Sequence, residues 1–276
     1  KKKAIRKGFN NSNGELLITL DADCVPGKRW LESIAKFYQH YDPDMIIAPV
    51  IMSPENTYLS RVFSLEFKSL LASTAGAAGL GQPIMCNGAN LAFKKSALNE
   101  LSDIYQHPSA SGDDIFLLEA MKRTGKSIRF CKSRESCVYT DAPATLRKFL
   151  RQRIRWLSKS KYYKDVSLRY VAMSVFLLNV GILGLLIGAI IYYEFIFFYL
   201  GMLTLKSIVD FALLAPVIKH FNMKAVLKYR YFLPIQLLYP FYILVVAVLS
   251  QISGFTWKER RYKETLIHKM YRKDYE

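Results

Sequence analysis

The first half of the chain alternates between short apolar runs and longer segments that carry one apolar face. Apolar runs of strand length cover residues 15–20 (ELLITL), 44–52 (DMIIAPVIM), 90–93 and one or two stretches within 127–139. Helical spacing of apolar residues covers the segment after Pro26-Gly27, then residues 57–74 and 113–123. Alternation of strands with helices predicts an α/β domain in which helices cover a sheet.

Three of these segments carry more specific expectations. The ELLITL run is apolar and ends at an acid, which predicts a buried parallel strand. Pro49 lies within the next run and predicts an edge position or a bend, because proline cannot donate to a strand ladder. Pro26 and Gly27 are expected to open a helix whose inner face carries Trp30, Ile34, Phe37 and Tyr38.

Residues 145–161 (TLRKFLRQRIRWLSKSK) combine an apolar helical face with many cations. That face consists of Leu146, Phe149, Leu150, Ile154, Trp156 and Leu157. Arg153 interrupts it, which a side chain reaching outward to water would tolerate. A basic helix with Trp and Leu on its apolar face is typical of a helix lying in the membrane interface.

Three longer apolar stretches follow, at residues 171–192, 195–217 and 231–251. Each reaches the length of about twenty residues that spans a bilayer, and the first two form a hairpin because their connection is short. Pro234 and Pro240 are expected to bend the third. Lys206 and Asp210 lie one turn apart in the second, as a mutually neutralising pair or as an intramembrane functional site.

Composition adds a membrane partner to this picture. The 276 residues are 51% hydrophobic and carry a net charge of +17, with the basic clusters beside the apolar stretches. That placement favours lipid headgroups over nucleic acid, for which the chain has no binding motif. The four cysteines have neither metal-ligand spacing nor a disulfide pattern, which indicates free thiols in a reducing compartment. We therefore expect a multi-pass protein of the cell (inner) membrane with a cytoplasmic catalytic domain, although the charge bias leaves the side of the C-terminal tail open.

Asp21 and Asp23 form an Asp-x-Asp motif directly after the first predicted strand. Two carboxylates at that spacing can approach one hard divalent cation that also binds substrate phosphates. The alternative is a solvated acidic loop. Because ligands bind at the carboxyl ends of parallel strands, the preceding strand favours the metal interpretation.

Two further motifs carry candidate chemistry. Asp113 and Asp114 open the predicted helix at 113–123, either as capping acids or as a general base that deprotonates an acceptor hydroxyl. Gln152, Arg155 and Trp156 project to neighbouring positions of the basic helix. They are suited to bind hydroxyls, a pyrophosphate and a sugar ring, while the alternative is an interfacial helix with a Trp anchor.

Together these motifs, in this order and before membrane spans, resemble the membrane-bound family 2 glycosyltransferases. The closest resemblance is to bacterial synthases of poly-N-acetylglucosamine, cellulose and hyaluronan. The matching segments are Lys3-Ala4-Ile5 with Gly8, Asn13-Gly14-Glu15, residues 87–95 with Gly88 and Asn90, Asp113-Asp114, residues 139–143, the QxxRW motif at 152–156, and Gly254–Lys258.

This resemblance implies a GT-A-type catalytic domain at 1–143, an interfacial helix at 144–168, a transmembrane region at 169–253 and a basic tail at 254–276. The implied reaction is inverting transfer from a UDP-sugar donor to a glycan or lipid-linked acceptor. Asp21 and Asp23 would bind Mg²⁺ or Mn²⁺, Asp114 would be the base and Asp113 would assist it. Donor and acceptor binding would fall to Gly88, Asn90, Gln152, Arg155 and Trp156, besides the metal ligands. Whether an accessory membrane subunit takes part stays open.

Two departures from the family pattern lead to further expectations. The family's first strand, which holds the uracil, is not found, so we expect an N-terminally truncated domain that binds UDP poorly alone. Asn87 stands where cellulose synthases carry Cys, so the acceptor need not be cellulose. The competing hypotheses are a non-processive transferase acting on a lipid acceptor, and a transporter or scaffold with a degenerate domain and a Lys206–Asp210 site.

Overall fold

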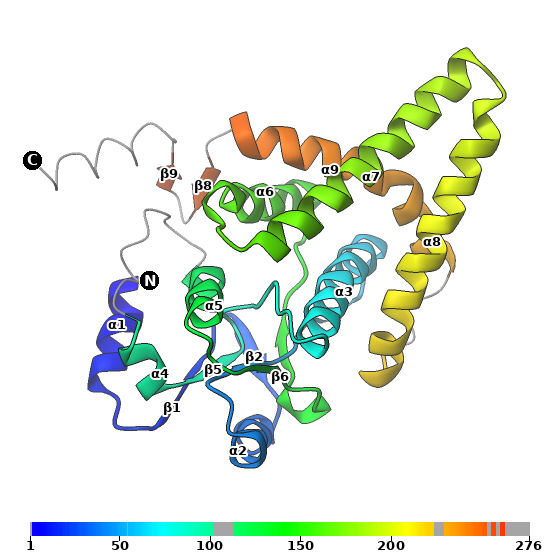
Figure 1. Ribbon diagram of the computed structural model, residues 1–276. Coiled ribbons are helices and arrows are strands. Elements are labelled where there is room, and N and C mark those ends of the chain that lie inside the picture. The colour runs from blue at the N-terminus through cyan, green and yellow to red at the C-terminus, as the bar shows by residue number, and fades with distance from the viewer. Residues whose placement is uncertain are drawn as a thin grey trace, which may run out of the picture.

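A computed structural model describes residues 2–53, 55–101, 113–223, 229–252, 255–257 and 260–262. An α/β domain is followed by a short amphipathic helix and then by three long apolar helices (Figure 1). The predicted α/β class and the three apolar helices are thereby confirmed. Most of the expected basic tail, including Gly254, Lys258 and the residues after 262, lies outside the described residues.

The described strands of the domain form two small sheets. The first has the order β1-β5-β3-β6, from β1 (Leu16–Thr19), β5 (Leu91–Lys94), β3 (Met45–Ile47) and β6 (Ile128–Phe130). The second has the order β2-β7-β4, from β2 (Cys24–Pro26), β7 (Val138–Thr140) and β4 (Val50–Met52). Within them only β3–β6 and β4–β7 pair in parallel. The prediction of a buried parallel strand at residues 15–20 is therefore wrong, because β1 is half-buried and runs antiparallel to β5.

The apolar run at residues 44–52 divides at Pro49 into β3 and β4, which belong to different sheets. Pro49 has no N–H, but its carbonyl accepts from the backbone N–H of Val138 and from the side chain of Asn90. The bend expected at this proline is confirmed. The chain thus passes from one sheet to the other without leaving the core.

Five helices belong to the α/β domain: α1 (Lys2–Asn11), α2 (Trp30–Tyr41), α3 (Tyr58–Gly79), α4 (Lys95–Asn99) and α5 (Asp113–Arg123). The helix expected to open at Pro26 begins instead at Trp30, because residues 24–26 pair with β7 as a strand. Thr57 caps α3 through a capping box with Ser60, and the helix continues beyond the predicted end at Thr74.

The central strands bury both faces against helices. Met45, Ile47 and Phe93 pack with Leu118 and Met121 of α5. The intervening residues Ile46 and Ala92 point to the opposite face and pack with Trp30 and Ile34 of α2. This period-two alternation with both faces apolar is what the uninterrupted runs of the sequence encode.

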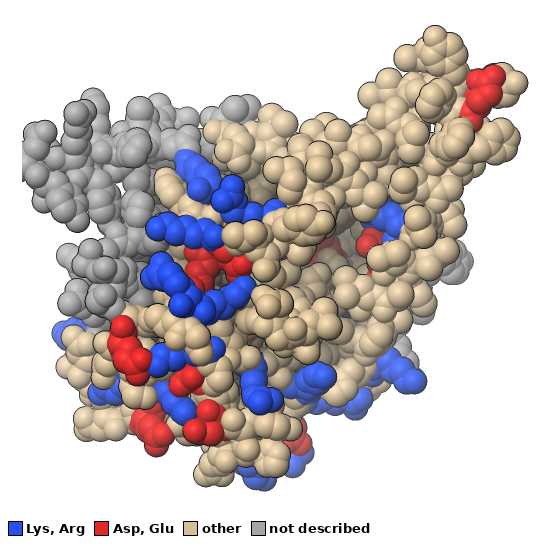
Figure 2. All heavy atoms as spheres, in the orientation of Figure 1, with Lys and Arg blue, Asp and Glu red and all other residues tan. Residues whose placement is uncertain are grey.

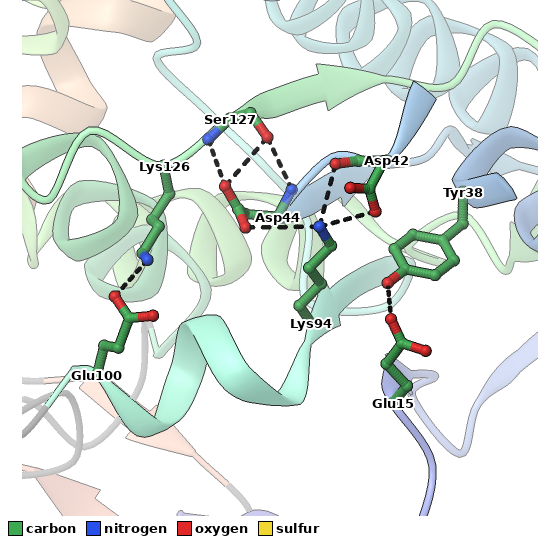
Figure 3. A network of polar contacts seen from close by, with 8 residues as sticks. All are labelled: Glu15, Tyr38, Asp42, Asp44, Lys94, Glu100, Lys126 and Ser127. Carbon is green, nitrogen blue, oxygen red and sulfur yellow. Dashed lines mark hydrogen bonds and ion pairs between the residues drawn. The ribbon is translucent and has the colours of Figure 1, made fainter. Parts of the chain in front are cut away.

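A polar network lies at one end of the strands of the first sheet (Figure 3). The Lys94 ammonium lies 2.8 Å from an Asp42 carboxylate oxygen, and the Asp44 carboxylate accepts from the backbone N–H of Ser127 at 2.8 Å. The Ser127 hydroxyl in turn accepts from the backbone N–H of Asp44 at 2.9 Å. These contacts connect the start of β3 to the loops before β6 and after α2, and so help to set the register of the sheet.

Helix α6 (Leu146–Leu157) lies between the α/β domain and the apolar helices. It begins at Thr145, whose side chain caps the helix by accepting from the Lys148 N–H. Leu146 is 53% exposed, whereas Arg153 is only 4% exposed and faces inward. The expectation that Arg153 reaches outward to water is therefore wrong, and the reason is an acidic partner described below.

The apolar helices are α7 (Val166–Ile191), α8 (Phe195–His220) and α9 (Tyr229–Ile252), each long and apolar enough to cross a membrane. The α7–α8 hairpin projects away from the α/β domain in Figure 1, and α9 packs against α7, α6 and α3. Pro234 and Pro240 lie inside α9. Short turns η1 (Arg134–Ser136) and η2 (Ser160–Tyr162) and a hairpin of β8 (Phe255–Trp257) and β9 (Arg260–Tyr262) complete the described elements.

Lys206 and Asp210 form an ion pair within α8, with 2.6 Å between the ammonium and a carboxylate oxygen. The Lys206 ammonium also donates to the side-chain oxygen of Gln236 in α9 at 2.6 Å and lies 4.8 Å from the centre of the Tyr239 ring. Lys206 is buried and Asp210 is partly exposed, and this satisfied pair fits the structural interpretation of the two residues, in which Lys206 joins α8 to α9.

Candidate active site

The two acids of the Asp-x-Asp motif lie in the turn between β1 and β2. The backbone N–H of Cys24 donates to the Asp21 carbonyl at 3.0 Å, which closes the turn. Asp21 is half-buried and Asp23 is exposed. Burial raises the pKa of the Cys24 thiol, and both aspartates add to this rise. Both acids therefore influence the same thiol from one short turn, and Asp23 is open to solvent.

Asp114 stands at the N-terminus of α5, where the helix dipole favours negative charge. Its Oδ2 accepts from the backbone N–H of Gly88 at 3.0 Å, and its Oδ1 accepts from the N–H of Ile115 at 3.0 Å. A Cβ at position 88 would lie 3.3 Å from the Asp114 Cβ, so any larger residue there would press against the Asp114 side chain. These two hydrogen bonds hold the carboxylate in one orientation.

Asn90 follows Gly88 and Ala89 in the predicted acceptor-side loop, and its side chain lies in the core. It is fully buried, and its amide donates to the carbonyls of Pro49 and Ser136, each at 2.8 Å. Its oxygen accepts from the indole N–H of Trp30 at 3.0 Å. These hydrogen bonds give the Asn90 side chain a structural role, and a binding role for this residue stays a prediction.

The QxxRW motif brings Arg155 towards both acidic motifs. Burial lowers the pKa of the Arg155 guanidinium, while the carboxylates of Asp114 and Asp21 act in the opposite direction. Arg155 is half-buried on α6, and both acids favour the charged form of its guanidinium. Figure 2 shows Lys and Arg side chains gathered around acidic ones where α6 overlies α5.

Trp156 packs against the domain. Its ring packs against a buried cluster of Val50, Met52, Phe67 and Ala89, which Cys24 also contacts. Cys24 follows Asp23, and Ala89 follows Gly88, so Trp156 lies beside both the Asp-x-Asp turn and the loop that holds Asp114. The two residues of the motif, Arg155 and Trp156, thus converge on the predicted site.

Several residues around this site were not predicted. Cys86 donates its thiol to the Asp114 carbonyl at 3.2 Å, and burial together with Asp114 raises the pKa of that thiol. Burial, Asp114, Glu119 and Cys86 raise the pKa of Tyr163. Glu66 pairs with Arg153 on the opposite side of α6. Only the Arg153 pairing left a signal in the sequence, namely a cation in the middle of an apolar stripe.

The candidate metal ligands can be compared with those that the expected divalent cation requires. Within the described ranges no three His, Cys, Asp or Glu side chains come together as a metal cluster. Mg²⁺ commonly uses only one or two protein carboxylates and completes its shell with water and substrate phosphates. Asp21 and Asp23 fit that arrangement, in which a diphosphate would supply the remaining oxygens.

Comparison with known proteins agrees with this geometry. Residues 16–253 match the family model described as glycosyl transferase family group 2. The chain is 26% identical over 209 residues to an N-acetylglucosaminyltransferase of Rhizobium leguminosarum bv. viciae, covering 69% of this chain and 48% of the relative. It is 26% identical over 166 residues to an N-acetylglucosaminyltransferase of Bradyrhizobium diazoefficiens (strain JCM 10833 / BCRC 13528 / IAM 13628 / NBRC 14792 / USDA 110), covering 56% and 33%.

The aligned part of the chain thus spans half or less of the length of these relatives. The family match is far more extensive, since it includes the Asp-x-Asp turn, the Asp114 helix, the QxxRW helix and all three apolar helices. The chain belongs to glycosyl transferase family group 2.

Proposed function

We propose that this chain transfers a sugar from a UDP-sugar to a hydroxyl group of a growing glycan or lipid-linked acceptor. The observation that carries the proposal is the Asp114 carboxylate, which the N–H groups of Gly88 and Ile115 hold in one orientation at the start of α5. A nucleotide diphosphate needs cationic charge, and an acceptor hydroxyl needs a base. The relatives described as N-acetylglucosaminyltransferases make UDP-N-acetylglucosamine the first donor to test.

The donor side is formed by Asp21, Asp23 and Arg155. The two aspartates would hold Mg²⁺ or Mn²⁺, which when bound supplies positive charge to the diphosphate. Arg155 adds a planar guanidinium suited to two phosphate oxygens, in a partly buried place where its charge is weakly screened. As the bond between the sugar C1 and the UDP oxygen breaks, Arg155 stabilises the charge that develops on the departing UDP.

The acceptor side is formed by Asp114 and its surroundings. The acceptor hydroxyl attacks C1 from the face opposite UDP, and its proton passes to the Asp114 carboxylate. The Gly88 N–H orients that carboxylate, and Asp113 precedes it in the first turn of α5. Trp156 offers a ring beside the same loop, against which a sugar can stack. A single displacement of this kind inverts the configuration at C1.

The three apolar helices imply a membrane location, and the basic residues beside them favour the side that holds nucleotide sugars. We place the α/β domain in the cytoplasm at the inner membrane, with the growing acceptor next to α6 and α9. The contacts of α9 with α3 and α6 bring the site close to the membrane helices.

The proposal is tested by incubating membranes that contain the whole protein with a panel of radiolabelled UDP-sugars. We expect incorporation from UDP-N-acetylglucosamine, with UDP released in equal amount. Sizing the product and extracting it with organic solvent separates a glycan acceptor from a lipid-linked one. Absence of incorporation from every UDP-sugar, while the protein is folded in the membrane, would contradict the proposal.

A further inference from the structure

Arg153, which lies within the QxxRW motif, is buried against Glu66 of α3. Arg153 is 4% exposed, and its partner Glu66 in α3 is 7% exposed. The Arg153 Nε lies 2.9 Å and 3.1 Å from the two Glu66 carboxylate oxygens, and its Nη2 also donates to Glu66. Tyr242 of α9 donates its hydroxyl to the same carboxylate at 3.1 Å. One buried ion pair therefore joins α3, α6 and α9.

The remaining nitrogen of the Arg153 guanidinium, Nη1, contacts another residue of the QxxRW motif. The Arg153 Nη1 donates to the Gln152 side-chain oxygen at 2.9 Å. The guanidinium carbon lies 4.3 Å from the centre of the Trp156 ring and 4.7 Å from that of Phe149. Arg153 thus contacts Gln152 and Trp156, two of the three motif residues for which the family resemblance implies substrate binding, and Glu66 holds it from the other side.

Arginine is suited to this place for geometric reasons. Its planar fork reaches Glu66 through Nε and Nη2 while Nη1 remains for Gln152, and its flat face covers an aromatic ring. A lysine would keep the charge beside Glu66, but a single ammonium cannot reproduce the fork or the stacking. The contact with Tyr242 extends this arrangement to a membrane helix.

From these contacts we infer that Arg153 is a positioning residue, which sets the orientation of Gln152 and Trp156 for sugar transfer. Glu66 and Tyr242 serve as its support and connect the motif to the membrane helix α9. The inference rests on the proposed function for the role of Trp156 and on the family resemblance for the role of Gln152, but the contacts of Arg153 are independent of both. It assigns no contact with substrate to Arg153 itself.

The variant Arg153→Lys tests the inference, because Glu66 keeps a buried cation and the helix packing is retained. We expect transfer in membranes to fall about tenfold or more, since misplacement by about 1 Å can cost a hundredfold. The control is Arg151→Lys, an exposed neighbour on the same helix, which should transfer like the parent. Equal membrane content of the three proteins shows that they fold.

A merely structural role is separated by combining variants. If Arg153 acts through the motif, Gln152→Ala and Trp156→Phe lower transfer less in the Arg153→Lys protein than in the parent. The inference is overturned if the fold-losses in transfer of the single variants multiply fully in the combined variants. It is also overturned if the Arg153→Lys protein is as active as the Arg151→Lys control.

A second readout needs no activity. The emission of Trp156 is obtained as the difference between each protein and its Trp156→Phe counterpart, since the chain holds three tryptophans. Quenching of this emission by acrylamide should rise at least about twofold in Arg153→Lys, where the stacking is lost. Unchanged quenching would refute the positioning role. A parent protein that transfers no sugar would refute the proposed function instead, and the quenching result would still judge Arg153.

Discussion

Replacing Asp114 by Asn removes the proposed base while changing the shape of the side chain very little. In the structure Oδ2 of Asp114 accepts from Gly88 and Oδ1 accepts from Ile115, both at 3.0 Å. The Asn amide has one oxygen and one NH₂ group, so it can keep only one of these bonds. The backbone N–H that loses its acceptor then faces the NH₂ group of the Asn side chain, which is also a donor.

The two consequences differ in size. Losing one hydrogen bond to a charged carboxylate lowers the free energy of unfolding by about 1.5–3 kcal/mol, which leaves the domain folded. Losing a general base slows transfer by about 10²–10⁴-fold, or about 3–5 kcal/mol of barrier. The catalytic loss is therefore expected to exceed the structural one. UDP affinity should stay nearly unchanged, because Asp114 is not assigned to the diphosphate.

The assay measures initial rates of sugar transfer in membranes, with UDP binding measured by calorimetry in detergent. Glu119→Gln is a matched control, since it makes the same carboxylate-to-amide change on α5. Glu119 accepts from the N–H groups of Lys164 and Asp165 through one oxygen, so Gln can keep both bonds. We expect this control to transfer normally. An Asp114→Asn protein that retains more than about a tenth of the parent rate would refute the base assignment.

Four further predictions follow from the same geometry. Gly88→Ala places a Cβ 3.3 Å from the Asp114 Cβ, and the resulting displacement should lower transfer about tenfold with little change in thermal unfolding; normal transfer would show that the loop yields freely. Chelation with EDTA should stop transfer, and Asp23→Ala should weaken UDP binding by calorimetry only when Mg²⁺ or Mn²⁺ is present; transfer that survives EDTA, or that is normal in both Asp21→Ala and Asp23→Ala, argues against the metal role. Trp156→Ala should lose transfer but remain in the membrane fraction after an alkaline wash, because α7, α8 and α9 anchor the chain; an active protein that is washed off would make Trp156 an anchor. Lys206→Met should lower the melting temperature in detergent, since it leaves Asp210 and Gln236 without their cation. The double variant Lys206→Met/Asp210→Leu should recover part of this loss. A double variant that melts below the single one would contradict the interpretation of the two residues as an ion pair.

The amino-acid sequence by itself determined the elements that depend on local patterns. The helix at Asp113–Arg123, the strand at Leu91–Lys94 and the three apolar helices follow from period, length and capping residues such as Thr57 and Thr145. The three chemical motifs could also be identified, because each combines particular residue types at a short fixed spacing.

Only the tertiary structure decided which strands pair and which side chains meet. The pairing of β1 with β5 joins residues more than seventy positions apart, and nothing local in ELLITL distinguishes a parallel from an antiparallel partner. The structural role of Asn90 emerged only when its amide was found between the two sheets. Arg153 looked like a cation reaching for water, because its partner Glu66 lies 87 residues earlier in the chain. A buried charge takes its meaning from the group that neutralises it, and folding alone brings that group to its side.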